Sequence, residues 1–181
     1  FFYGTPGTRL TDDMEQCLDE LYSRYVEHWN LAPVDYEEKK MTRRVKSLLQ
    51  ANRLGRLYKD APWVGTEVYH ISLPLAFSPQ DSDVPEKAIK PLNLAQPTPT
   101  KVYTRGDEWI AKIRRLKRID SLPERFLFVV KYPSDEEGRE AAGDICEALK
   151  TLGTEIVELG DDEGILEFAR IEEQRELKLS S

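Results

Sequence analysis

Apolar residues recur at helical intervals through much of the first third of the chain. Residues 12–29 carry them every three or four positions, and this spacing predicts an amphipathic helix. Asp35 and Glu38 have the spacing of a capping box, and the apolar stripe that follows predicts a second helix over 35–54. We therefore expect an N-terminal helical pair.

The pattern then changes from a helical period to a period of two. In 68–77, apolar and other residues alternate as they do in a half-buried strand, and Pro74 indicates a sheet edge or a bulge. A shorter run at 88–94 predicts a second strand. We expect the two strands to form an antiparallel hairpin with a long connection.

The last third of the chain alternates between strand and helix patterns. Residues 125–131 form a nearly continuous apolar run, which is typical of a strand covered on both faces. Ser134 and Glu137 form another capping-box pair and predict where the next helix begins. The remaining predicted elements are a helix at 135–152, a strand at 154–159 and a last helix that starts at Asp161.

Strands that alternate with helices favour parallel pairing, with the helices covering the sheet. The predicted fold class is α/β, with α+β as an alternative: a mixed sheet of about four strands flanked by helices, with the N-terminal helical pair. We expect residues 1–60 to form the helical pair. Residues 61–181 then form the hairpin and an α-β-α-β-α unit, packed with the helices in one compact domain.

Composition is that of a soluble globular protein. Of the 181 residues, 40% are hydrophobic and 33% are charged, and no apolar run approaches the length of a membrane span. The two cysteines, Cys17 and Cys146, lack metal-site spacing, so we expect buried thiols and a reducing, cytoplasmic setting. Because the chain begins at Phe1 and not at Met, we expect it to be a fragment or a processed product.

Charge is distributed unevenly along the chain. The predicted helix at about 106–119 is amphipathic, and the span 101–118 has seven basic against two acidic residues, a net charge of +5. The whole chain has a net charge of −7, so the residues outside 101–118 have a net charge of −12. Such asymmetry points to a binding partner. The candidate partner-binding residues are Lys101, Arg105, Lys112, Arg114, Arg115, Lys117 and Arg118.

Two interpretations of this basic helix are open. Its cations can bind nucleic acid or an acidic protein, with Tyr103 as a stacking surface beside them. Alternatively, they contact the chain's own carboxylates, since residues 134–176 hold 15 Asp and Glu against four Lys and Arg. An isoelectric point near 5.1 disfavours non-specific nucleic-acid coating, so a protein partner is slightly favoured.

Catalytic motifs are sparse. Acidic residues at Asp135 and Asp161 follow predicted parallel strands, where α/β proteins place their sites, and Lys131 ends one strand. They allow a metal-dependent nuclease or phosphodiesterase as the alternative function, although helix capping also explains them. His28 and His70 have no activating neighbours, and we expect no cofactor. The favoured prediction is a non-enzymatic interaction module that uses the basic helix.

Overall fold

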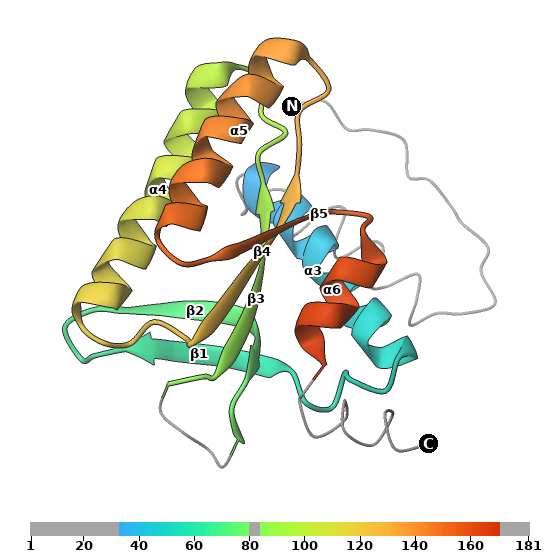
Figure 1. Ribbon diagram of the computed structural model, residues 1–181, viewed down its shortest axis with the longest axis vertical. Helices are drawn as coiled ribbons and strands as arrows, with labels where there is room; N and C mark the ends of the chain where they lie inside the picture. Colours follow the sequence, from blue (N-terminus) through green and yellow to red (C-terminus); the bar gives the residue numbers. More distant parts are fainter. Residues whose placement is uncertain (1–32, 80–83, 171–181) are drawn as a thin grey trace, which may run out of the picture. The chain divides into compact units, whose positions relative to one another are not determined.

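A computed structural model describes residues 33–79 and 84–170 (Figure 1). The predicted helix at 12–29 lies outside these residues, so the helical pair and the division at residue 60 stay predictions. The described residues from Glu38 onward belong to one compact unit. The elements in chain order are α3 (Pro33–Ala51), β1 (Lys59–Gly65), β2 (His70–Phe77), β3 (Lys87–Asn93), α4 (Pro99–Arg118), β4 (Arg125–Lys131), α5 (Glu136–Thr151), β5 (Glu155–Glu158) and α6 (Asp162–Ala169).

The sheet is mixed, as predicted, and its strands are ordered β1-β2-β3-β4-β5. The pairs β1–β2 and β2–β3 are antiparallel, whereas the pairs β3–β4 and β4–β5 are parallel. The expected count of about four strands is one too low for the described residues. The missing strand is β1, whose pattern is interrupted by Pro62 and whose pairing with β2 has two register shifts. Such irregularities are common in edge strands and hide the period of two.

Helices cover both faces of the sheet (Figure 1). The helices α4 and α5 pack side by side on one face, over a core that includes Trp109, Ile113 and Phe128. The helices α3 and α6 cover the other face, over a core that includes Leu49 and Leu127. Every inner residue of β4 is buried, as its continuous apolar run predicts.

Three helix starts differ from their predicted positions. The helix α3 begins at Pro33, so Asp35 lies inside it and is not its capping residue. The helix α4 begins at Pro99, well before residue 106, because Thr98 caps it and proline suits the first helical position. The helix α5 is capped by Asp135, whose side chain accepts the N–H of Gly138, and not by the predicted Ser134. Among the described residues, no helix is both long and apolar enough to cross a membrane.

Candidate functional site

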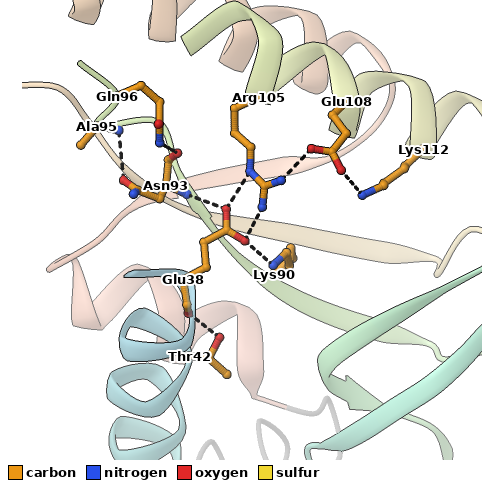
Figure 2. A network of polar contacts seen from close by, with 9 residues as sticks. All are labelled: Glu38, Thr42, Lys90, Asn93, Ala95, Gln96, Arg105, Glu108 and Lys112. Atoms are coloured by element: carbon orange, nitrogen blue, oxygen red, sulfur yellow. Dashed lines mark hydrogen bonds and ion pairs between the residues drawn. The ribbon is translucent and has the colours of Figure 1, made fainter. Parts of the chain in front are cut away.

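A buried carboxylate, Glu38, links three elements of the fold (Figure 2). It extends from α3 and is only 4% exposed. Its Oε2 accepts from Lys90 Nζ at 2.7 Å and lies 2.7 Å from Arg105 Nη2. Its Oε1 accepts from Arg105 Nε and from the backbone N–H of Asn93, each at 3.1 Å. The helix α3 is thereby joined to both β3 and α4.

The place where Glu38 meets the sheet follows from the strand pairing. The ladder between β2 and β3 ends at Leu75 and Ile89, so within the described sheet the later residues of β3 pair with β4 only. Pro91 has no N–H to leave unpaired on that stretch. The backbone N–H of Asn93, which has no partner strand on that side among the described residues, donates to the carboxylate of Glu38. The carboxylate thus completes the backbone hydrogen bonding of a partly unpaired strand.

Each oxygen of Glu38 already accepts two donors. A carboxylate has about four lone-pair directions, so this group is saturated. A saturated carboxylate has no free position for a metal ion or for a proton taken from a substrate. The chemistry available to this cluster is therefore structural: it neutralises two buried cations and fixes the relative positions of α3, β3 and α4.

The cluster continues along α4 through a second carboxylate. Arg105 Nη1 donates to Glu108 Oε2 at 2.6 Å, and Lys112 Nζ donates to Glu108 Oε1 at 2.5 Å. The ammonium groups of Lys90 and Lys112 also lie 5.1 and 4.7 Å from the centroid of the Trp109 ring. These distances suit cation–π attraction, which lowers the cost of removing the two ammonium groups from water.

Burial and charge act in opposite directions on the cations of this cluster. Burial lowers the pKa of Lys90, and the adjacent Glu38 offsets this only in part. Burial also acts to lower the pKa of Arg105, but Glu38 and Glu108 outweigh it and raise that pKa above its ordinary value. Arg105 is therefore held firmly as a cation by internal carboxylates.

The seven residues predicted to bind a partner separate into two groups. Arg105 and Lys112 belong to the internal cluster, and the side chain of Arg105 is only 15% exposed. These two residues therefore contact the chain's own carboxylates, and the partners are Glu38 and Glu108. The other five side chains are exposed: Lys101, Arg114, Arg115, Lys117 and Arg118.

Four of the five exposed cations gather at one end of α4, which we name the basic end: Arg114, Arg115, Lys117 and Arg118. Arg115 lies over the ring of Tyr69, 5.1 Å from its centroid, and Lys117 donates to the carbonyl oxygen of Leu152 at 3.2 Å. Within the described residues, no carboxylate forms an ion pair with any of the four. Cations in the last turn also interact favourably with the helix dipole, which partly explains their position.

The turn between β1 and β2 lies next to the basic end of α4, because the ring of Tyr69 in this turn contacts Arg115. Its side chains include Val68, which is 96% exposed, and the hairpin carries Trp63, which is 52% exposed. The ring of Trp63 stacks on His70 at 3.5 Å with an angle of 14° between the planes. Trp63 could not be recognised from the sequence, because the strand β1 that carries it has no clear alternation, and the sequence around His70 indicated no activating neighbour for it.

Carboxylates at the parallel strand ends are occupied by helix capping. Asp135 accepts the N–H of Gly138 at 2.7 Å, and Asp161 accepts the N–H of Gly164 at 3.0 Å. In the part of the chain that the structure describes, no three His, Cys, Asp or Glu side chains gather as a metal site would require. The alternative prediction of a metal-dependent nuclease therefore has no ligand set there.

One predicted thiol lies within the described residues. Cys146 is buried and free, and its Sγ lies 3.3 Å from the hydroxyl oxygen of Tyr132. Burial raises the pKa of this thiol above its ordinary value, which keeps it protonated and unreactive at neutral pH. Cys17 and His28 lie outside the described residues.

The chain was compared with models of protein families, with curated proteins and with solved structures, and none of them matches it. Its function is therefore inferred from its residues and their geometry.

Proposed function

We propose that this chain is a non-enzymatic interaction module that binds an acidic protein surface through the basic end of α4. One observation carries the proposal: four exposed cations lie within about one and a half helical turns and form no ion pair with any described carboxylate. Elsewhere on the same helix, Arg105 and Lys112 are matched by internal carboxylates. The contrast on one helix favours a role for the unmatched end in binding.

The basic end is presented on a firm support. Ile113 and Leu116, in the same turns of α4, are fully buried in the core. Arg115 is further ordered by the ring of Tyr69. A binding group that is already positioned loses less conformational entropy when a partner docks, and this favours affinity.

A protein partner fits better than nucleic acid. Once Arg105 and Lys112 are excluded, the predicted binding residues no longer form a continuous series. Lys101 lies about 20 Å along α4 from the basic end. Four cations can neutralise only about four phosphates, which gives modest affinity at physiological salt. The net charge of −7 also repels a polyanion at long range.

A non-enzymatic role is supported by the state of the candidate acids. Glu38 is saturated by its four donors. Asp135 and Asp161 accept backbone N–H groups at helix starts. Carboxylates that are held in this way suit structure better than catalysis.

Affinity capture tests the proposal. The full chain and the variant Arg114→Glu/Arg118→Glu are used as baits in an extract of the native cell, with and without nuclease. A matched control, Lys46→Glu/Arg53→Glu, changes the charge equally at exposed positions on and just after α3. We expect a protein retained by wild type and control, resistant to nuclease, and lost with the α4 variant. Equal capture by all three baits, or capture abolished by nuclease, would contradict the proposal.

A further inference from the structure

We infer that the acidic partner is a second copy of this chain, docked antiparallel through the outer face of α4 and α5. The inference rests on the proposed function, because it uses the basic end of α4 as the cationic half of the contact. It adds the identity of the partner and the residues that the partner supplies.

The two helices form one continuous surface. They lie side by side and run in the same direction, with Tyr103 donating to Asp144 Oδ2 at 2.6 Å (Figure 1). Gly106 lets them approach closely, since a Cβ there would lie 2.4 Å from Ile145 side-chain atoms. The surface is therefore rigid, and charges on α4 and α5 hold fixed positions relative to one another.

This surface is acidic at one end and basic at the other. Along its first twelve residues, α5 exposes five carboxylates against one basic side chain, Arg139, and α4 adds Asp107 beside this stretch. The only one of these five with a hydrogen-bond partner among the described residues is Asp144. The basic end of α4 lies at the opposite end, beyond the last turn of α5. The five carboxylates of α5 are Glu136, Glu137, Glu140, Asp144 and Glu147.

Acidic and basic side chains of α4 lie on the same outward face of the helix. Along α4, Asp107, Ala111, Arg114 and Arg118 follow one another at intervals of three or four residues, so they share one face. Asp107 and Arg118 are then about 16 Å apart along the axis. The exposed Ala111 stands between the two charges, and its small side chain permits close approach of another helix.

Such a surface is complementary to itself. A two-fold axis perpendicular to the helices at the level of Ala111 brings the basic end of each copy onto the acidic end of the other. The same set of contacts then forms twice, as in any isologous dimer. Because this face offers few apolar side chains, we expect an association that depends on charge and weakens at high salt.

Sedimentation equilibrium of the full chain tests the inference with two charge-reversed variants. Arg114→Glu/Arg118→Glu cancels the net charge of the basic end and leaves the acidic end intact, whereas Glu140→Lys/Glu147→Lys removes most of the negative charge of the acidic end and leaves the basic end intact. We expect the wild type to dimerise, and each variant to dimerise at least about tenfold more weakly. An equimolar mixture of the two variants should regain the dimer, because their faces are complementary. The control Lys46→Glu/Arg53→Glu should dimerise like the wild type.

Three outcomes would overturn the inference: a monomeric wild type at all concentrations, a dimer that neither variant weakens, or a mixture that fails to associate although circular dichroism shows both variants folded. The proposed function fails separately. If the wild type is monomeric but captures another protein through Arg114 and Arg118, the second copy is excluded and the proposed function stands. If the wild type neither dimerises nor captures another protein, the inference and the proposed function are both wrong.

Discussion

Nη2 of Arg105 lies 2.7 Å from Oε2 of Glu38, a residue 67 positions earlier in the chain. This ion pair joins α3 to α4 across the edge of β3 (Figure 2). It also divides the cations of α4 by function. Arg105 stabilises the fold, whereas Arg114 and Arg118 at the other end of the helix have no carboxylate partner among the described residues.

Removing the charge of Glu38 should destabilise the protein. In Glu38→Gln, Lys90 and Arg105 lose the anion that neutralises them while they remain largely buried. Loss of one partner from a buried ion pair costs about 3–5 kcal/mol, and we expect the lower part of that range because an amide keeps some hydrogen bonds. Urea denaturation measures the free energy of unfolding. Glu124→Gln, at an exposed position, is the control and should change it by less than about 0.5 kcal/mol. Equal stability of both variants would contradict a central role for Glu38.

The stability contributed by Glu108 should depend on pH. Burial acts to raise the pKa of its carboxyl, but Lys112 and Arg105 outweigh burial and hold this pKa below the ordinary 4.5. A carboxyl with a lowered folded pKa stabilises the fold above its unfolded pKa, and this contribution is lost as pH falls through the folded value.

We therefore expect Glu108→Gln to cost about 0.3–1 kcal/mol at pH 7, a small effect because the side chain is 45% exposed. The difference from wild type should shrink as pH falls below 4.5. Urea denaturation at a series of pH values checks this, and a difference that stays constant down to about pH 3 would rule out the ion pairs as its source.

Two helical glycines should respond oppositely to alanine. At Gly106, a Cβ would lie 2.4–2.5 Å from three atoms of Ile145, so Gly106→Ala should separate α4 from α5 and cost about 1–3 kcal/mol. At Gly143, nothing lies within 4 Å of the added atom, and Gly143→Ala should stabilise α5 by about 0.5–1 kcal/mol. Thermal unfolding measures both. Stabilisation by Gly106→Ala would show that the two helices are packed less closely than described.

Much of the fold could be predicted where the residue pattern was uninterrupted. The buried run of β4 and the apolar stripe of α5 each match an element in the structure. The strand β1 could not be predicted, because Pro62 and the register shifts remove the alternation that identifies a strand. The early start of α4 was missed although Thr98 and Pro99 form a recognisable helix start, so that signal was available in the sequence.

The site could be predicted only in part, because its decisive contacts join distant residues. Helical phase separates the buried from the exposed side of α4, and it identified Arg114 and Arg118 as exposed. Phase cannot show that Arg105 meets a carboxylate 67 positions away. Glu38 looked like a capping residue, since its spacing from Asp35 fits a capping box, and nothing local indicated that it would be buried at a strand edge.

The most direct test of the account follows the Nε–H signals of the arginines by NMR while poly-L-glutamate is added to the full chain. Nε of Arg105 donates to Glu38 at 3.1 Å, whereas Arg114 and Arg118 are exposed. We predict that the signals of Arg114 and Arg118 shift with added polyanion and that the signal of Arg105 does not. A shift of Arg105, or unchanged signals for Arg114 and Arg118, would contradict the claim that the basic end of α4 binds an acidic surface.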